Sequence, residues 1–433
     1  MPDQLMQVKA SAPAKIIMVF TVSLALFASW FVVRWYLGNT IAEYFHPDER
    51  RLETAQVAVS LAPSDPFPHW RLGNLIQTEL PPDQIPLVVA EYEKAVSLSP
   101  NDYRFWMDLG HALEQEGEFE KAEKALREAV KLAPSYAYPR WLLGNLLLRA
   151  GRYTEGFAEL QRASDADGEF QSQLFNLAWQ INKDDFDALR AAIGNAPESR
   201  AEFSKYLVAR GRFDEGLRFW NTLTETEKRA NRAAADSVIG SLVAANRYNN
   251  AVEIWNEIAP GPAYRAESGH IIDGGFESNL AHGPGAVFGW QVQSVSQVQI
   301  GIDPAQGHSG SRSLRIFFQV RSHLDAVNVS QLVPVKPDTQ YDFECYIKTE
   351  NLESAATPVV VITNPHAQES IYVASAAAPN GNNNWQKVSL SFKTAPKSEA
   401  VRVRIGRSSC EDNPVCPIFG TVWYDDFDLK PRK

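Results

Sequence analysis

The sequence predicts a multidomain protein with an N-terminal transmembrane helix, an all-α helical-repeat solenoid and a C-terminal all-β jelly-roll sandwich. Three observations carry this prediction: an uncharged apolar run over residues 16–33, a recurring helix-turn-helix pattern over residues 47–258, and alternating apolar and polar residues over residues 268–433. Residues 259–267, which contain APGPAY, are predicted to be a linker because Pro and Gly end the helical pattern there. At 433 residues the chain is long enough for two or three domains.

The composition is that of an ordinary globular protein, with 45% hydrophobic and 22% charged residues. A formal net charge of −10 at pH 7 without clustered Lys and Arg argues against a nucleic-acid partner. The sequence also has no glycine-rich phosphate loop, no helix-borne His pair and no nucleophile elbow. We therefore expect a protein that is not an enzyme.

Residues 16–36 are predicted to form a single transmembrane helix. The run IIMVFTVSLALFASWFVV is long enough to cross a hydrocarbon core of about 30 Å. A cleaved secretory signal is the alternative, but small residues at the cleavage spacing are missing, and residues 34–36 are typical of a membrane interface. Basic residues before the run favour a cytoplasmic N-terminus over residues 1–15, with the bulk of the chain extracytoplasmic, in the periplasm, at the cell membrane.

The central region repeats itself every 34 residues. Gly110 and Gly144 are 34 positions apart, and so are Gly117 and Gly151. Each unit should contain a first helix, a turn at its second glycine and a second helix closed by proline, as in LEQEGEFEKAEKALREAVKLAP. Fainter copies end in EYEKAVSLSP, KDDFDALRAAI, GRFDEGLRFW and NRYNNAVEIW. Because each helix pair can bury its apolar face only against its neighbours, the units are predicted to stack into one right-handed solenoid.

The unit at residues 103–136 resembles the tetratricopeptide repeat. Eight residues fall where the pattern of that family expects them, namely Trp106, Leu109, Gly110, Leu113, Ala122, Leu126, Ala129 and Pro134. The resemblance implies a concave groove for a protein or peptide partner, formed largely by the first helices. The side chains expected to line this groove are Trp70, Asn74, Met107, His111, Trp141, Asn145 and Arg149.

Aromatic, Met and Asn side chains together suit an extended peptide, whose backbone the amides could bond. Packing of Trp70 and Trp141 against the next helix is the open alternative. The family's basic clamp for a C-terminal carboxylate is not reproduced, because Trp70, Asp108 and Leu142 stand where Lys, Asn or Arg would be expected. We therefore expect no ligand of the chaperone-tail type.

The last third changes from helical periodicity to alternation. Segments such as SLRIFFQV, YDFECYIKT, QKVSLSFKT and VRVRIGR are predicted to be strands separated by Gly, Asn and Pro turns, in a sandwich of roughly eight strands. The ordered motifs IIDGGFE, GHSGSRSLRI, WQKVSLSFKTA and GTVWYDDFDL resemble the jelly-roll carbohydrate-binding modules of the galactose-binding-like type. The resemblance covers nearly all of residues 268–433 and implies a contact with polysaccharide.

The resemblance also implies a structural Ca²⁺ ion, with Glu277 and Asp425 as matching ligands and carbonyls around Gly310 completing the shell. Alternation predicts that Asp425 shares one face of the last strand with Trp423, Phe427 and Leu429, where a carboxylate is costly unless paired or coordinated. A carboxylate bonded to turn amides without metal is the alternative.

A sugar site needs an aromatic platform and planar polar side chains. On the outward faces of the strands we select Asn328, Tyr346, Tyr372, Arg402 and Arg404 as candidate carbohydrate ligands, although a solvated sheet face explains them equally well. The loops that carry Trp290, Asn364 and His366 are the alternative location. Trp385 is expected to fill the core, as the matching family position does.

Two of the three cysteines, Cys410 and Cys416, flank a turn-prone Asp-Asn-Pro and could form a disulfide, which would require an oxidising compartment. Taken together, these features predict a membrane-anchored extracytoplasmic adaptor that recruits proteins through its repeats and touches glycan through its jelly roll, in envelope polysaccharide assembly or export. A purely structural protein–protein scaffold without a sugar site is the alternative.

Overall fold

A computed structural model describes residues 12–44, 50–79, 81–278, 280, 287–293, 298–319, 329–367, 370–407 and 416–432. It confirms the predicted fold class: an apolar N-terminal helix, a helical-repeat region and a β-sandwich of two antiparallel sheets. The chain divides into two compact units, Met1–Gly194 and Asn195–Lys433. The boundary between the units therefore falls inside the predicted repeats and not at the predicted linker.

The first unit begins with the long helix α1 (Ala12–Tyr44), whose apolar side chains are exposed along most of its length. Within the described ranges it is the one helix long and apolar enough to cross a membrane. Its last turns pack on α2 (Arg51–Leu61), where Gly38 and Ala42 are buried. A Cβ atom on Gly38 would lie 2.7 Å from the Cβ of Ala62, so this close approach requires glycine.

Polar side chains of α1 also bond to the first repeat. The indole Nε1 of Trp35 and the Nδ2 of Asn39 donate to the same oxygen, Oδ2 of Asp65, at 2.7 and 3.1 Å. Arg34 Nη2 donates to the carbonyl oxygen of Ser60 at 2.8 Å. The C-terminal turns of α1 are therefore part of the helical-repeat fold.

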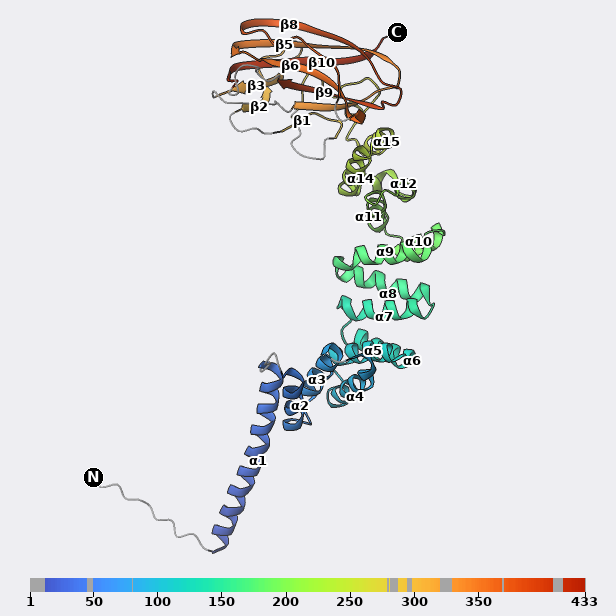
Figure 1. Cartoon of the computed structure of the whole chain (residues 1–433), viewed down its shortest axis with the longest axis vertical. Coiled ribbons are helices and arrows are strands. Elements are labelled where there is room, and N and C mark those ends of the chain that lie inside the picture. The colour runs from blue at the N-terminus through green and yellow to red at the C-terminus, as the bar shows by residue number, and fades with distance from the viewer. Residues whose placement is uncertain are drawn as a thin grey trace, which may run out of the picture. The chain divides into compact units, whose positions relative to one another are not determined.

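Shorter helices follow α1 and pack as consecutive pairs, α3 with α4, α5 with α6, α7 with α8 and α9 with α10 (Figure 1). Their bounds are α3 (Pro66–Glu79), α4 (Ile85–Leu98), α5 (Tyr103–Glu116), α6 (Phe119–Leu132), α7 (Ala137–Arg149), α8 (Tyr153–Ala166), α9 (Gln171–Asn182) and α10 (Phe186–Ile193).

The 34-residue period has a direct packing cause. A Cβ on Gly110 of α5 would lie 2.6 Å from Cγ of Leu126 on α6, and a Cβ on Gly144 of α7 would lie 2.7 Å from Leu160 on α8. Each glycine therefore allows a large leucine to fill the crossing of its helix pair. Gly117, which ends α5, has φ 90° and bonds back to the helix, which confirms the predicted turn.

The second unit opens with five helices, and the fainter repeat copies correspond to α12 and α15 within it. The short α13 interrupts the repeat pattern, and its N-terminus carries a capping box in which Thr224 and Glu227 bond each other's backbone N–H groups. The helix bounds are α11 (Pro197–Val208), α12 (Phe213–Trp220), α13 (Glu225–Ala230), α14 (Arg232–Ala244) and α15 (Tyr248–Ile258).

The sandwich of the second unit consists of two five-stranded antiparallel sheets among the described residues. The first sheet has the order β1 (Gln291–Val292), β4 (Val329–Pro334), β9 (Ala400–Arg407), β6 (Pro358–Asn364), β7 (Ser370–Ala374). The second sheet has the order β2 (Val298–Asp303), β3 (Ser313–Phe318), β10 (Ile418–Pro431), β5 (Gln340–Ser354), β8 (Gly381–Lys393).

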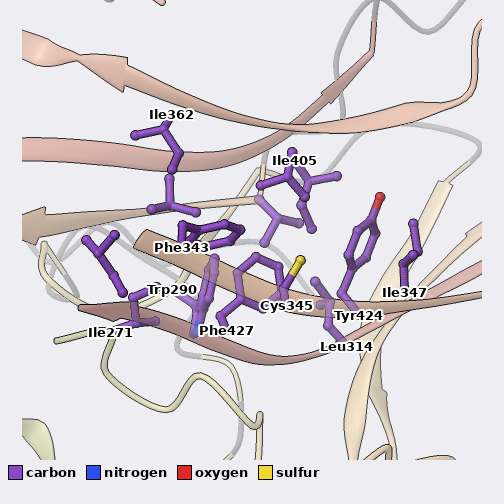
Figure 2. Close-up of a cluster of buried hydrophobic side chains, with 14 of the residues drawn as sticks. Ile271, Trp290, Leu314, Phe343, Cys345, Ile347, Ile362, Ile405, Tyr424 and Phe427 are labelled. Atoms are coloured by element: carbon purple, nitrogen blue, oxygen red, sulfur yellow. The ribbon is translucent and has the colours of Figure 1, made fainter. Parts of the chain in front are cut away.

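The two sheets enclose an apolar core with an aromatic centre. Figure 2 shows Trp290 and Phe427 beside Phe343 in this cluster. The ring centroids of Trp290 and Phe427 are 4.9 Å apart, and those of Phe343 and Phe427 are 5.7 Å apart. Edge-on arrangements of this kind add to the stabilisation from area burial.

A second apolar cluster joins the helices to the sandwich. Trp255 of α15 meets Phe288 at a centroid distance of 5.8 Å, and Leu332 of β4 is buried in the same cluster as the apolar side chains of α14 and α15. The predicted linker lies within this contact, because both polar atoms of the Asn256 side chain bond the backbone of Ala266, at 2.8 and 3.0 Å. Helices α14 and α15 and the sandwich therefore share one core.

Strand β10 departs from the predicted alternation. Val422 and Tyr424 point into the core before a register shift between residues 425 and 428, whereas Phe427 and Leu429 point into it afterwards. Asp426 at φ 50° marks the bulge. The prediction that Trp423, Asp425, Phe427 and Leu429 share one face is therefore wrong, because the extra residue rotates the strand by half a period.

Candidate functional site

The predicted groove residues lie on equivalent helices of three successive pairs. Each of α3, α5 and α7 is the first helix of its pair, and together they carry all seven residues. Gln77 of α3 donates to Gln115 of α5 at 2.9 Å, and Arg149 of α7 donates from Nε to Glu114 of α5 at 2.6 Å. These bonds between first helices place the predicted side chains along one continuous face.

Trp70 contacts the next repeat directly. Its indole Nε1 donates to Oδ2 of Asp108 at 2.6 Å, and its ring lies 5.9 Å from that of Phe105, both on α5. Burial raises the pKa of Asp108, although the indole bond opposes this shift. Trp141 behaves similarly, because its ring stacks on that of Phe170 at 4.9 Å, at the start of the following pair. Both tryptophans thus have a packing role, and their role in ligand binding stays a prediction.

The two groove asparagines are oriented by their own helices. Asn74 Nδ2 donates to the carbonyl of Trp70 at 3.0 Å, and Asn145 Nδ2 donates to that of Trp141 at 2.8 Å. Each amide carbonyl oxygen remains as an acceptor on the half-buried face. A peptide backbone N–H is the matching donor.

The middle and far end of the groove are polar but nearly neutral. Met107 and His111 lie half-buried on α5, and the Nε2 atom of His111 lies 3.0 Å from Gln115. The Arg149 guanidinium is paired with Glu114, whose side chain is 8% exposed. The one arginine among the predicted groove residues is therefore already paired with a carboxylate.

The candidate carbohydrate residues do not form one site. Val401, Val403 and Ile405 of β9 belong to the core, so Arg402 and Arg404 point outward from the first sheet. Tyr346 points outward from the second sheet, between the core residues Cys345 and Ile347 of β5. The two arginines and Tyr346 therefore lie on opposite outer faces of the sandwich, and the role of each in carbohydrate binding stays a prediction.

The remaining carbohydrate candidates also separate from this group. Tyr372 packs on Phe392 of the core at 5.6 Å, and its hydroxyl lies 2.7 Å from that of Ser398. It therefore faces the space between the sheets. Asn328 lies outside the described residues.

The loop alternatives are structural as well. Trp290 is buried and donates from Nε1 to the carbonyl of Asp273 at 3.0 Å. Asn364 is buried, and His366 accepts the backbone N–H of Glu399 at Nε2 and packs edge-on against Tyr248 of α15. These side chains hold the loops and the junction with the helices.

The outer face of the second sheet carries an aromatic cluster that sequence reasoning missed. The ring of His308 stacks on Tyr346 with centroids 3.6 Å apart and planes 14° apart, and Trp385 of β8 meets His308 edge-on at 5.7 Å. Trp385 is half-buried and outside the core cluster, so the expectation that it fills the core is wrong. We name His308, Tyr346 and Trp385 the outer aromatic cluster.

Acidic side chains fix the loop that brings His308 to this face. Asp426 accepts bonds from His308 Nδ1 at 2.6 Å and from Ser309 Oγ at 2.5 Å. Asp425 Oδ2 accepts the backbone N–H groups of His308 at 2.6 Å and Ser309 at 3.3 Å. The positive φ of Asp426 places both carboxylates of the pair under the same loop.

The predicted calcium ligands meet at this loop. Glu277 Oε1 accepts the N–H groups of Ser311 at 3.0 Å and Arg312 at 3.2 Å, and a Cβ on Gly310 would lie 2.1 Å from that oxygen. Burial raises the pKa of Asp425, while bonds from the loop N–H groups oppose the shift. The two carboxylates therefore already hold the loop through its amides.

The donor chemistry fits calcium, since Glu277 and Asp425 offer only oxygen to the same short segment. Over the part of the chain that the structure describes, no group of three or more His, Cys, Asp and Glu side chains is arranged to hold a metal ion. The calcium site stays a prediction, with amide binding as the arrangement observed.

The predicted disulfide lies partly outside the described residues, because Cys410 is not among them. Cys416 is buried, with its sulfur 3.0 Å from Nη2 of Arg407. Cys345 is a buried free thiol in the core. The bond between Cys410 and Cys416 remains a prediction.

Two family models match the chain. Residues 89–137 and 107–169 match the model described as tetratricopeptide repeat, and residues 268–408 match the model described as carbohydrate binding domain. Both predicted resemblances are thereby confirmed. The outer aromatic cluster lies within the second match.

The similar proteins cover parts of the chain. Over 74 residues it is 32% identical to the E3 ubiquitin-protein ligase CHIP of Arabidopsis thaliana, which covers 17% of this chain and 27% of that protein. The chain thus spans about a quarter of the length of this curated relative.

Among solved structures, MamA from Desulfovibrio magneticus RS-1 is 16% identical with a TM-score of 0.29, covering 44% of this chain and 92% of that chain. YrrB, described as a TPR protein with an unusual peptide-binding site, is 17% identical with a TM-score of 0.26, covering 49% and 95%. A structure described as "CBM4 structure and function" is 15% identical with a TM-score of 0.29, covering 37% and 99%.

Proposed function

We propose that this chain, which carries tetratricopeptide repeats over residues 89–169 and a carbohydrate-binding domain over residues 268–408, is a membrane-anchored extracytoplasmic adaptor. Its repeats hold a protein or peptide partner, and its sandwich holds a glycan. The role we assign to it is the assembly or export of an envelope polysaccharide. It acts by binding, without catalysis of its own.

The outer aromatic cluster carries the glycan half of the proposal. The C–H face of a pyranose packs on an aromatic ring, and the hydroxyls of the sugar need polar partners beside it. The exposed loop that carries His308 and the half-buried ring of Trp385 offer such a surface. Lys387 lies on β8 with Trp385, and Glu344 lies on β5 with Tyr346. These two charged side chains, paired at 2.6 Å, supply polar groups beside the aromatic rings.

The glycan half is tested with the full chain in detergent on an array of surface polysaccharides. Tyr346→Ala and Trp385→Ala should each weaken glycan binding about fivefold to thirtyfold, since stacked rings contribute about 1–2 kcal/mol. Tyr138→Ala, which removes an exposed ring from α7, is the matched control and should bind as the unmodified chain does. Equal binding by all three variants would refute the proposed location.

The repeat half rests on the two oriented amides of Asn74 and Asn145. A photoreactive residue at position 145 should crosslink a partner, whereas one at position 131, where Lys131 is exposed on α6, should not. Equal crosslinking from the two positions would argue against a groove on the first helices.

The anchor rests on the way α1 continues into the fold. Cleavage after the apolar run would cut helix α1 directly before Arg34 and Trp35, whose side chains bond the first repeat. We therefore propose that the helix is retained as a membrane span. The intact mass of the mature protein tests this directly, and loss of the first 30 or so residues, as expected for a secretory signal, would contradict it.

Calcium belongs to the proposal as a structural ion held by Glu277 and Asp425. It would supply positive charge to two carboxylates, one of which is fully buried. Addition of Ca²⁺ to the chelated full chain should raise its unfolding temperature, and Asp425→Asn should abolish the increase. No calcium effect on the unmodified chain would remove the ion from the proposal.

A purely structural scaffold is the second candidate. One observation favours it: the sandwich is joined to α14 and α15 through a common core, as expected for a domain that serves to rigidify the repeats. Under this alternative, no glycan binds the unmodified chain, and crosslinking from position 145 still captures a partner.

A further inference from the structure

A cavity lined by three arginines lies in the second unit, on the side of the helices. Its volume is about 420 Å³, and it is formed where α13 and α14 meet the end of α15 and the segment that follows it. Arg229, Arg232 and Arg265 line it together with Asn256 and residues 258–262, and no acidic side chain of the described residues is part of the lining. We name these residues the arginine pocket.

The positive charge of the pocket is only partly neutralised. Arg232 pairs with Asp236 at 3.6 Å, and Arg229 pairs with Glu225 at 3.4 Å, where both side chains are well exposed. Such an exposed pair contributes little because water screens it. Arg265 is exposed and makes no ion pair with any residue that the structure describes. A local positive charge of this kind is unusual in a chain with a formal net charge of −10.

The pocket is held in place by bonds around it. Asn256 fixes Ala266, the residue next to Arg265, and Trp255 Nε1 donates to the carbonyl of Tyr264 at 2.8 Å on the other side. Helix α14 begins at Arg232, and no side chain caps its N-terminus. The positive end of this 13-residue helix lies at the pocket, as does the negative end of α15, where the carbonyl oxygen of Ile258 accepts a bond from Arg232 Nη1 at 3.4 Å.

Guanidinium groups recognise carboxylate and phosphate because their N–H groups form paired, charge-assisted bonds to two oxygens. The volume lies within the range of small-ligand sites, about 300–1,000 Å³, and exceeds what a bare anion needs. Pro260 and Pro262 add apolar wall, while the Asn256 amide is used internally. The fitting ligand is therefore a small ring or chain unit that carries one anionic group.

We propose that the arginine pocket binds the carboxylate of an acidic saccharide unit. The choice of a saccharide rests on the proposed function, because the pocket belongs to the same compact unit as the carbohydrate-binding domain. The adaptor would then select anionic polysaccharides over neutral ones through a site outside the sandwich.

The test uses the full chain in detergent and the probes glucuronate, glucose and inorganic phosphate, with binding measured by calorimetry at 0.15 M salt. Glucuronate should bind, and glucose should bind far more weakly. Arg265→Gln should weaken glucuronate binding about tenfold or more, the effect of losing one hydrogen bond between charged groups. Because Arg265 is exposed and unpaired among described residues, this variant should fold normally.

The matched control is Arg218→Gln, which removes the same charge from an exposed position on α12 outside the pocket lining. It should bind glucuronate as the unmodified chain does. Equal weakening by the two variants would show a general effect of net charge and overturn the proposal. Equal binding of glucose and glucuronate, or binding of phosphate without glucuronate, would overturn it as well.

A further variant separates this site from the proposed glycan site on the sandwich. Tyr346→Ala should leave glucuronate binding unchanged, and its loss in that variant would overturn a separate pocket. Conversely, if neutral polysaccharides fail to bind while glucuronate binding still depends on Arg265, the arginine pocket stands and the proposed function of the outer aromatic cluster fails.

Discussion

The two sets of repeat helices use the same pairing in different ways. In the first unit, α5 to α8 pack only on neighbouring helices, through Gly110 and Leu126 and through Gly144 and Leu160, and leave the first-helix face open. In the second unit, α14 and α15 bury an apolar face against strands of the sandwich. A helical repeat can therefore either leave one face uncovered or bury that face against another domain.

The difference lies in side chains more than in helix geometry. The first-helix face in the first unit is covered by polar bonds between repeats, such as those from Gln77 and Arg149. At the corresponding end of the second unit, Trp255 and Ile258 are buried and meet apolar residues of the sandwich. Substitutions at matched positions should therefore have larger effects in the second unit.

The largest loss of stability is expected for a substitution inside the sandwich, at Gly274. A Cβ there would lie 2.0 Å from the carbonyl oxygen of Phe427, and backbone cannot move aside as a side chain can. Gly274→Ala should lower the free energy of unfolding of the second unit by about 4 kcal/mol or more, measured by urea denaturation of the full chain. Gly275→Ala is the control, because its nearest contacts are at 3.7 Å, and an equal loss in both variants would contradict the steric explanation.

The next effect tests the shared core. Trp255→Ala should lower the free energy of unfolding of the second unit by about 3 kcal/mol, because it removes a ring packed on Phe288 and a bond to Tyr264. Hydrogen exchange should show α15 and β4 losing protection together. Loss of protection in α15 alone would contradict a common core.

A smaller effect is expected at the helix crossing in the first unit. Gly110→Ala should lower the free energy of unfolding of the first unit by about 2 kcal/mol, because the added Cβ displaces Leu126. The loss is smaller than at Gly274 because the side chain of Leu126 is flexible and can move aside. Gly168→Ala, with no atom within 4 Å of its Cβ, is the control and should change stability little. A loss at Gly110 as large as at Gly274 would remove the contrast between the two units.

The bond between Trp70 and Asp108 should contribute about 1 kcal/mol. Trp70→Phe keeps the ring and leaves the half-buried carboxylate without its indole partner. Because burial already raises the pKa of Asp108, the variant should raise that pKa further, as NMR titration would show. An unchanged pKa would show that the indole bond does not matter.

The smallest effects are opposite pH dependences in the two units. His69 has a raised pKa: burial lowers it, but bonds to Glu91 at 2.6 Å and to the Pro63 carbonyl outweigh burial. The stabilisation that protonated His69 contributes is fully present below about pH 6.5, the pKa of histidine in the unfolded chain. It is lost as the pH rises through the pKa of His69 in the folded protein.

His366 has a lowered pKa, mainly through burial, which the charge of Glu399 partly offsets. The stabilisation that neutral His366 contributes is present above about pH 6.5. It is lost as the pH falls through the pKa of His366 in the folded protein. Between pH 8 and 5.5, hydrogen exchange should therefore show α3 gaining protection and β9 losing it. His69→Gln and His366→Gln should each cancel one trend, and parallel trends in the two units would contradict these assignments.

Local patterns predicted most of the fold. The spacing of Gly110 and Gly144 predicted the helix pairs because one residue type serves one local crossing. The strand order was not predictable, since it depends on contacts between segments far apart in sequence. The sequence therefore did not reveal that Tyr346 and Arg404, two candidate carbohydrate ligands, lie on strands β5 and β9 of different sheets.

The site was less predictable than the fold for the same reason. The stack of His308 on Tyr346 joins residues 38 positions apart and depends on the loop that Asp425 and Asp426 hold. The bulge at Asp426 gave no signal in the alternating pattern, because a single inserted residue only becomes visible in the pairing with β5. The motif GHSGS, which marks this loop, was the available signal.

An adaptor of this kind must hold a partner and a glycan at the same time. The most direct measurement crosslinks the partner at position 145 of the full chain and then passes the complex over immobilised polysaccharide. We predict that the crosslinked complex is retained, and that Tyr346→Ala releases it while Tyr138→Ala does not. A complex that never binds the polysaccharide, or that binds equally well with Tyr346→Ala, would contradict the adaptor.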